Sequence, residues 1–252
     1  MTGGEPTVVS LRGVHKAFAG KPVLAGIDLE MRRGETVVVM GGSGTGKSVL
    51  LKHINGLIRP DSGQVVVLGC DVAQLSEEAL VPLRRQVSYV FQNGALFDSL
   101  RVGENVAFAL VEHTDLDDAA IAARVSELLA SVGLEGSEPL TPSALSGGMR
   151  KRVALARGLA LEPEVILYDE PTAGLDPLTG VTITALIKKI AQARRATSLV
   201  VTHDLLVARE LGGRVAFLRA GVFEFTGTFG EAALVDGPAG EFVRAGGVHA
   251  RE

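Results

Sequence analysis

Length, composition and charge limit the classes of protein to which this chain can belong. Its 252 residues suffice for one to two domains, or for one core with an inserted subdomain. Hydrophobic residues make up 46% and charged residues 21%, which excludes disorder over most of the chain, and the net charge of -4 disfavours a general nucleic-acid binder. No apolar run approaches the roughly 18 residues of a membrane span, and Cys70 alone cannot form an internal disulfide, so we expect a cytosolic protein that meets a membrane through a partner.

The N-terminal part of the chain is predicted to form strands around one helix. Apolar and polar residues alternate over Ile27–Met31, which is typical of a half-buried strand. The run Thr36–Met40 is continuously β-branched or apolar, as in a strand buried on both faces of a parallel sheet. A Gly-rich loop and a helix to about Leu57 follow it. Two further strands are expected at Val8–Val14 and Val65–Leu68.

The pattern becomes helical between about Leu96 and Leu161. An apolar stripe at helical spacing runs through this segment and ends before Gly133, a natural helix stop. The stripe consists of Ile121, Val125, Leu128, Leu129 and Val132. We interpret it as subdomain core rather than a membrane-surface helix, because the polar face lacks a cluster of Lys and Arg.

Strands and helices alternate again in the C-terminal part. The helix Leu178–Arg194 separates the predicted strands Val165–Tyr168 and Ser198–Thr202. A hairpin is expected from Val215–Leu218 and Val222–Phe225. The tail beyond residue 246 carries no packing signal, and we expect residues 247–252 to be disordered.

The Gly-rich loop fits the phosphate-binding pattern G-x-x-x-x-G-K-[ST] between a buried strand and a helix. It comprises Gly41, Gly42, Ser43, Gly44, Thr45, Gly46, Lys47 and Ser48. Glycines allow backbone N–H groups to converge on phosphate oxygens, and the helix N-terminus adds partial positive charge. We expect Lys47 to bridge the β- and γ-phosphates of a nucleotide and the Ser48 hydroxyl to hold Mg²⁺. The alternative is a flexible turn with a surface lysine.

Two acids end the predicted strand Val165–Tyr168. A phosphate-loop enzyme needs a carboxylate at the C-terminal edge of the neighbouring strand to fix Mg²⁺, and Asp169 suits that role. Glu170 is then placed to act as general base on the attacking water. A solvated loop is the alternative. His203 follows the next strand in the same way and is expected to donate to the γ-phosphate, with a structural hydrogen bond as the alternative.

Further motifs resemble those of the ABC ATPase family. Leu145–Met149 resembles the ABC signature, and Asp169–Asp176 resembles the Walker B motif with its D-loop. Gln92 is similar to the Q-loop glutamine, and His203 to the switch histidine. These motifs occur in the family's order, and no other phosphate-loop class has the whole set. With the flanking strands, the resemblance covers the chain from about residue 8 to residue 229.

This resemblance implies an α/β fold, the P-loop NTPase ABC cassette. It has a mixed sheet core, an antiparallel β subdomain and an inserted helical subdomain, here at about residues 96–161 of a single domain over residues 5–246. The implied activity is ATP hydrolysis with Mg²⁺. The resemblance places Glu170, His203 and Gln92 among the catalytic residues, and it places Gln92 with Ser48 and Asp169 at the metal.

The resemblance also implies a homodimer with ATP at the interface. Ser146, Gly147 and Gly148 begin a helix far in sequence from the phosphate loop, and in the family they complete the partner subunit's nucleotide site. Phe18 stands where the family has an aromatic side chain that stacks on adenine, with strand-core packing as the alternative. We interpret the basic run at residues 150–152 as a solvated helix face rather than a DNA contact.

The signature has Met149 where most family members have Gln. This departure, the stretch Phe91–Leu100 and the stretch Lys47–His53 resemble the cassettes of MCE-associated, Mla-type lipid transporters. The resemblance implies an ATPase subunit that moves phospholipid or a related lipid between membranes of the cell envelope. The partners of this subunit would be a membrane permease and an MCE-type lipid-binding protein. The subunit would lie at the cytoplasmic face of the inner membrane.

Alternative functions follow from the same motifs. The chain could serve another ABC transporter, for an amino acid or other small solute, or it could be a soluble ABC ATPase without a transport role. We expect the apolar stretch Gly94–Phe97 to contact the permease, with core packing of Leu96 and Phe97 as the alternative.

Overall fold

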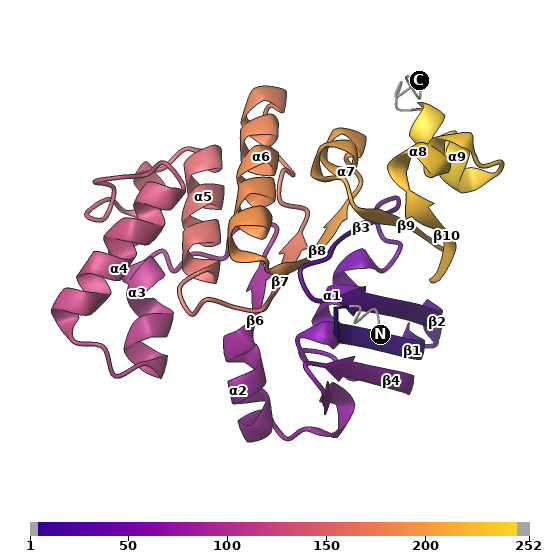
Figure 1. The fold of residues 1–252 in the computed structure, drawn as a ribbon, viewed down its shortest axis with the longest axis horizontal. Helices are drawn as coiled ribbons and strands as arrows, with labels where there is room; N and C mark the ends of the chain where they lie inside the picture. Colours follow the sequence, from indigo (N-terminus) through magenta and orange to yellow (C-terminus); the bar gives the residue numbers. More distant parts are fainter. Residues whose placement is uncertain (1–4, 246–252) are drawn as a thin grey trace.

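A central sheet, a smaller sheet and a lateral group of helices make up the fold (Figure 1). The computed structural model describes residues 5–245. The tail at residues 247–252, which we expect to be disordered, lies outside the described residues.

The central sheet has six strands in the order β10-β9-β3-β8-β7-β6. Neighbouring strands are parallel, except for the antiparallel hairpin β9–β10. The sheet is therefore mixed, as predicted. Its strands are β3 (Thr36–Met40), β6 (Val87–Val90), β7 (Val165–Asp169), β8 (Thr197–Thr202), β9 (Arg214–Arg219) and β10 (Val222–Thr228).

A second, antiparallel sheet has the order β2-β1-β4-β5. Its strands are β1 (Thr7–Phe18), β2 (Lys21–Arg32), β4 (Ser62–Val67) and β5 (Cys70–Asp71). The first two strands are longer than the sequence pattern indicates, because their backbones stay paired beyond the last buried side chains, as far as Phe18 with Lys21.

Helices cover the central sheet and extend beyond one end of it. The α-helices are α1 (Lys47–Ile54), α2 (Glu77–Gln86), α3 (Val102–His113), α4 (Asp118–Ser131), α5 (Gly147–Gly158), α6 (Pro177–Arg194), α7 (Leu205–Leu211), α8 (Phe229–Leu234) and α9 (Pro238–Ala245). Two short 3-10 turns, η1 and η2, occupy Val72–Gln74 and Pro142–Ala144. Helices α3, α4 and α5 lie side by side at one end, next to α6 (Figure 1).

Two hydrophobic cores lie on opposite faces of the central sheet. Along β3, Val38 and Met40 pack into the core under the helices, and Val37 and Val39 pack into the core shared with the antiparallel sheet and α1. This alternation confirms the prediction that β3 is buried on both faces. The cores hold the C-terminal ends of β3, β7 and β8 in one rigid edge.

The apolar stripe of α4 packs as predicted. Val125, Leu128 and Leu129 are buried in the core that α3 and α5 share. The helix ends just before Gly133, whose φ of +68° lies in the left-handed region. The stripe therefore serves helix packing rather than a membrane surface.

Candidate nucleotide site

The phosphate loop connects β3 to α1, and two of its glycines are required by the backbone. Gly41 has φ +155°, and a Cβ there would lie 2.3 Å from the Leu218 carbonyl oxygen. Gly46, immediately before α1, has φ +102°, and a Cβ would lie 3.0 Å from Val23. No other residue fits these two positions without moving backbone, so the loop stays pressed against the sheet edge.

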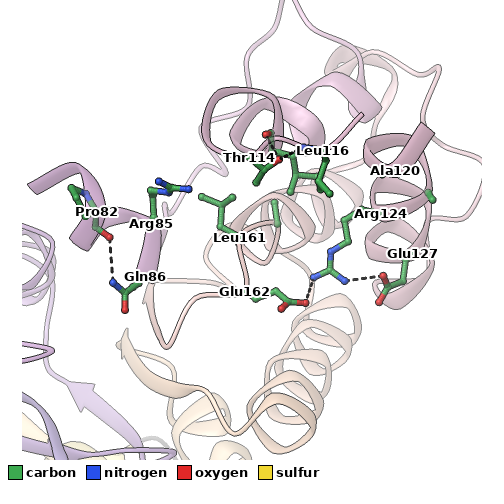
Figure 2. Close-up of a pocket in the computed structure, with 13 residues that line it drawn as sticks. Pro82, Arg85, Gln86, Thr114, Leu116, Ala120, Arg124, Glu127, Leu161 and Glu162 are labelled. Atoms are coloured by element: carbon green, nitrogen blue, oxygen red, sulfur yellow. Dashed lines mark hydrogen bonds and ion pairs between the residues drawn. The ribbon is translucent and has the colours of Figure 1, made fainter. Parts of the chain in front are cut away.

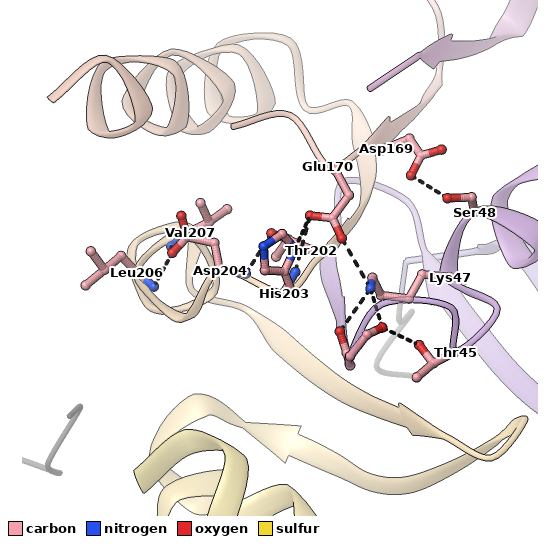
Figure 3. Close-up of polar contacts among 12 residues, drawn as sticks. Thr45, Lys47, Ser48, Asp169, Glu170, Thr202, His203, Asp204, Leu206 and Val207 are labelled. Atoms are coloured by element: carbon pink, nitrogen blue, oxygen red, sulfur yellow. Dashed lines mark hydrogen bonds and ion pairs between the residues drawn. The ribbon is translucent and has the colours of Figure 1, made fainter. Parts of the chain in front are cut away.

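Lys47 is the first residue of α1 and is only 6% exposed. Its Nζ donates to the carbonyl oxygens of Gly41 and Gly42, at 2.9 Å each. It also lies 3.2 Å from Glu170 Oε1 (Figure 3). The prediction of a surface lysine on a flexible turn, held as the alternative, is therefore wrong: this lysine is buried and fixed within the loop.

Asp169 ends β7 with both carboxylate oxygens engaged. Oδ1 accepts a hydrogen bond of 2.8 Å from the Ser48 hydroxyl, and Oδ2 accepts one of 2.8 Å from the Tyr89 hydroxyl. Burial, followed by the charge of Asp169, raises the pKa of Tyr89 far above its ordinary value, so the phenol stays protonated. Hydroxyl and carboxylate oxygens are the hard ligands that Mg²⁺ prefers, so Ser48 and Asp169 fit this metal.

Glu170 follows directly and turns back toward α1. Its φ is +45°, a left-handed conformation that costs a non-glycine residue on the order of 1–3 kcal/mol. Its backbone N–H donates to the Val201 carbonyl, which ties the residue to β8. Its Oε2 lies 2.9 Å from His203 Nδ1 and accepts from the His203 backbone N–H at 3.3 Å (Figure 3). The pairing of β7 with β8 therefore brings these two residues together.

A cavity of about 630 Å³ lies over the loop. Among the described residues it is lined by Val23, Gly42, Ser43, Gly44, Gly46, Lys47, Ser48, Val49, Gln92, Glu170, His203 and Phe242. Most of the predicted phosphate-loop residues, with Gln92, Glu170 and His203, thus share one cavity. Gly41 and Thr45 do not line the cavity, but the Thr45 hydroxyl donates to the Gly42 carbonyl, and Asp169 is joined to the cavity through its hydrogen bond with Ser48. Phe242, from α9, is a lining residue that no sequence pattern indicated.

Phe18 and the signature residues do not line this cavity. Phe18, at the end of β1, is 42% exposed, so strand-core packing is wrong for it. Ser146 is exposed and caps α5, accepting from the Met149 backbone N–H at 3.2 Å. A Cβ on Gly148 would lie 2.5 Å from the Thr179 methyl carbon, so close packing on α6 requires this glycine. The first residues of α5 are therefore not part of this chain's own cavity.

The basic run on α5 is only partly a solvated face. Arg150 is exposed, but Lys151 is 7% exposed and its Nζ donates to the carbonyl oxygens of Gln92 and Glu170. Burial lowers the pKa of Lys151, and the carboxylates of Asp169 and Glu170 oppose that shift. The prediction of a solvated face is wrong for Lys151, which joins the signature helix to two parts of the site.

A larger cavity, of about 910 Å³, lies between α2 and the ends of α3, α4 and α5 (Figure 2). Its Arg124 is already paired with Glu127 at 2.8 Å and with Glu162 at 2.6 Å. None of its described lining residues comes from the phosphate loop. The smaller cavity is therefore the candidate nucleotide site.

Comparison with known families decides the class of this site. The family model described as ABC transporter matches residues 24–173, more than half of the chain, from β2 through the acids that end β7. The chain belongs to the ABC transporter family. It is an ATP-binding cassette, an ATPase of the ABC type, and its two sheets and lateral helices are those of this fold.

Relatives with different named roles are similarly close. Protein TRIGALACTOSYLDIACYLGLYCEROL 3 of Arabidopsis thaliana is 43% identical, over 87% of this chain and 68% of its own. The intermembrane phospholipid transport ATP-binding protein MlaF of Haemophilus influenzae is 42% identical, over 71% of this chain and 68% of its own. The probable ribonucleotide transport ATP-binding protein mkl of Mycobacterium tuberculosis is 42% identical over 86% of this chain, which spans only 61% of that protein.

A solved structure agrees with the fold. The dimeric, post-hydrolysis ATP-binding cassette MJ0796, bound to ADP and Pi, superposes with a TM-score of 0.81 at 35% identity. The match covers 88% of this chain and 98% of that one. Among the residues described here, none of the helices combines the length and apolarity that a bilayer crossing needs.

Proposed function

We propose that this ABC cassette hydrolyses ATP in the cavity over its phosphate loop to drive transport of phospholipid or a related lipid through a separate membrane permease. The observation that carries the enzymatic part is the meeting of Lys47, Glu170 and His203 in one cavity, with Asp169 held on Ser48 at its edge. Each residue comes from the C-terminal edge of a central-sheet strand or the helix start beside it.

Binding of the triphosphate uses the loop and Lys47. The backbone N–H groups of the loop and the start of α1 supply partial positive charge for phosphate oxygens. The Lys47 ammonium is already held at the cavity wall by two carbonyl oxygens and the Glu170 carboxylate. When a nucleotide binds, its phosphate oxygens would replace some of these partners of the Lys47 ammonium. Because the ammonium already lies at the cavity wall, it would need to move little.

The metal is assigned to Ser48 and Asp169, with Gln92 as a further contact from the cavity wall. Ser48 lies in the loop and Asp169 at the end of β7, joined by a 2.8 Å hydrogen bond. Gln92 is exposed and lines the same cavity. When bound, Mg²⁺ supplies positive charge that stabilises the phosphate oxygens during transfer.

Glu170 is assigned as the general base. Its carboxylate is buried beside the phosphate loop, where it can take a proton from a water aligned with the γ-phosphate. His203 contacts the same carboxylate from β8 and is exposed toward the cavity. Its Nδ1 therefore orients Glu170, and its Nε2 can also donate to the phosphate when both ring nitrogens carry a proton.

Two chains are proposed to share each pair of nucleotides. The signature residues Ser146, Gly147 and Gly148 begin α5 but do not line this chain's cavity. A helix N-terminus with an exposed serine is suited to a second chain's phosphates. The dimeric state of MJ0796 with ADP and Pi supports the same arrangement. Phe18, exposed at the end of β1, is assigned to the adenine ring.

The permease is proposed to dock near Phe97. A groove of about 480 Å³ lies between β6, α3 and α5 and is lined in part by Phe91, Phe97 and Phe108. Phe97 is 43% exposed and Phe108 44% exposed, with ring centroids 4.9 Å apart. Leu96 instead packs against the helical core, so the core alternative holds for Leu96 alone. This groove combines aromatic rings with Arg84, Arg85 and Arg157, and its Phe91 directly precedes Gln92, so it suits a helix of a membrane protein.

Lipid as cargo is supported by the sequence features shared with Mla-type cassettes and by the phospholipid role in the name of MlaF. The same proposal includes a position at the cytoplasmic face of the inner membrane and an MCE-type protein in the complex. The mkl relative, named for ribonucleotide transport at the same identity, keeps another solute as the second candidate.

The test of the cargo is the composition of the native complex. The chain, tagged in its own organism, is purified with its membrane partners, and copurified proteins and small molecules are identified by mass spectrometry. The proposal expects a permease, an MCE-type protein and phospholipid or sterol above the level of a mock purification. A soluble solute-binding protein and no enriched lipid would reject the lipid role and leave the ATPase assignment intact.

A further inference from the structure

The hydroxyl of Tyr89 is part of the metal-site geometry, although no motif of the sequence includes it. It donates to Asp169 Oδ2 at 2.8 Å, while Ser48 donates to Oδ1 at the same distance. An ionised carboxylate can only accept, so the phenol is the donor. With one donor on each oxygen, the Asp169 carboxylate cannot rotate without losing a charge-assisted hydrogen bond.

Strand register explains why Tyr89 reaches this carboxylate. In the parallel pair β6–β7, Tyr89 lies opposite Leu167, and Asp169 is two residues further on. Side chains two apart on a strand project from the same face, so Tyr89 reaches along that face to Asp169. Tyr89 is half-buried against the core shared with α1.

Tyr89 also lines the groove assigned to the permease. The ring stacks on that of Phe91 with centroids 4.2 Å apart and an interplanar angle of 29°. Both residues line the 480 Å³ groove, and Phe91 is 37% exposed there. A group that fills the groove therefore meets a ring packed directly on the residue that holds Asp169.

We propose that Tyr89 is a positioning residue for the Asp169 carboxylate, and that its stack on Phe91 makes this positioning respond to the permease helix proposed for the groove. The inference rests on the proposed function, because it takes Asp169 as a metal ligand. A positioning role for Tyr89 differs from a merely structural role in one respect. It predicts that loss of the hydroxyl changes the Mg²⁺ dependence of nucleotide binding but not the affinity for nucleotide without metal.

The decisive variant is Tyr89→Phe, which keeps the ring and its stack and removes only the hydroxyl. Outer partners of metal ligands typically contribute about 10–100-fold to metal affinity. We expect the Mg²⁺ concentration for half-maximal binding of a fluorescent, non-hydrolysable ATP analogue to rise about tenfold. Affinity for the same analogue in EDTA should stay within about twofold of wild type.

Tyr168→Phe is a matched control, because these are the chain's two tyrosines. Tyr168 directly precedes Asp169 but packs in the core on the other face of the sheet. Loss of its hydroxyl should leave the Mg²⁺ midpoint unchanged. A comparable rise in both variants would mean that either hydroxyl merely supports the strand, and it would overturn the inference.

The stack is tested with Phe91→Ala, alone and combined with Tyr89→Phe. If Phe91 acts through the Tyr89 hydroxyl, Phe91→Ala should raise the Mg²⁺ midpoint about threefold, and the double variant should equal Tyr89→Phe alone. Additive effects would overturn the link to the groove. An unchanged midpoint in Tyr89→Phe would overturn the positioning role, whereas a wild-type chain that fails to bind the analogue would overturn the proposed function itself.

Discussion

The ammonium of Lys47 and the carboxylate of Glu170 form a buried ion pair, with Nζ 3.2 Å from Oε1 and side chains that are 7% and 11% exposed. The residue assigned to the phosphates and the residue assigned to the water therefore neutralise each other in the chain alone. Removal of either charge leaves the other buried without its partner, which makes the pair matter for folding as well as for nucleotide binding.

Lys47→Met should abolish nucleotide binding and lower the free energy of unfolding by about 3 kcal/mol. This value is at the low end for a broken buried ion pair, because His203 still contacts Glu170. Urea unfolding measures the second effect. Adding Glu170→Gln should recover most of the lost stability, because the buried charge is then gone. A single variant as stable as wild type would show that the ion pair does not form in solution.

His53 should make stability depend on pH. It is buried, its Nδ1 donates to the Val49 carbonyl at 2.7 Å, and its Nε2 has no partner among the described residues. Burial lowers the pKa of His53 below its ordinary 6.5, although the hydrogen bond to the Val49 carbonyl opposes this shift. The folded state thus favours the neutral ring, and stability present above about pH 6.5 is lost as the pH falls.

The His53→Leu variant should lack this loss. In urea unfolding at pH 7.5 and 5.5, wild type should lose up to about 1.4 kcal/mol more per pH unit than the variant below pH 6.5. The exposed His15 offers a matched control, and His15→Leu should keep the wild-type slope. Equal slopes for wild type and His53→Leu would contradict a buried neutral imidazole.

Phe97→Asp should separate nucleotide binding from membrane association. A carboxylate at this exposed position would oppose an apolar partner in the groove but touches nothing in the nucleotide cavity. We expect unchanged ATP affinity of the isolated chain and at least about tenfold less chain pelleting with native membranes. Leu234→Asp, at a 75% exposed site on α8, should pellet like wild type. Equal pelleting of Phe97→Asp would place the permease elsewhere.

The nucleotide site was predictable where its signals are local in the sequence. The phosphate loop is read from residue spacing between a buried strand and a helix, and Asp169, Glu170 and His203 each follow an apolar strand directly. The contact of Lys47 with Glu170 was not predictable. It depends on the path that the backbone takes in three dimensions after Gly46, which no local pattern of the sequence indicates. The two sequence motifs assign Lys47 and Glu170 to the nucleotide. They do not indicate that the two side chains contact each other when no nucleotide is bound.

Other features depend on tertiary structure that no local pattern contains. The hydrogen bond of Tyr89 to Asp169 depends on the register of β6 against β7, and β6 has only four residues. Lys151 sits in a basic run that is typical of solvent, yet the carbonyls of Gln92 and Glu170 hold it inside. Helix α2 carries Pro82 in its interior, which argues against a helix from sequence alone. Phe242 reaches the cavity from α9, far along the chain.

The central claim, that Glu170 activates water for ATP hydrolysis in this cavity, is tested most directly by the steady-state MgATP hydrolysis rate of Glu170→Gln beside wild type. Loss of a general base should lower turnover about 10²–10⁴-fold while ATP affinity is kept. Glu162→Gln, the same change at a glutamate outside the cavity, should hydrolyse ATP at the wild-type rate. A Glu170→Gln variant that hydrolysed ATP as fast as wild type would contradict the account.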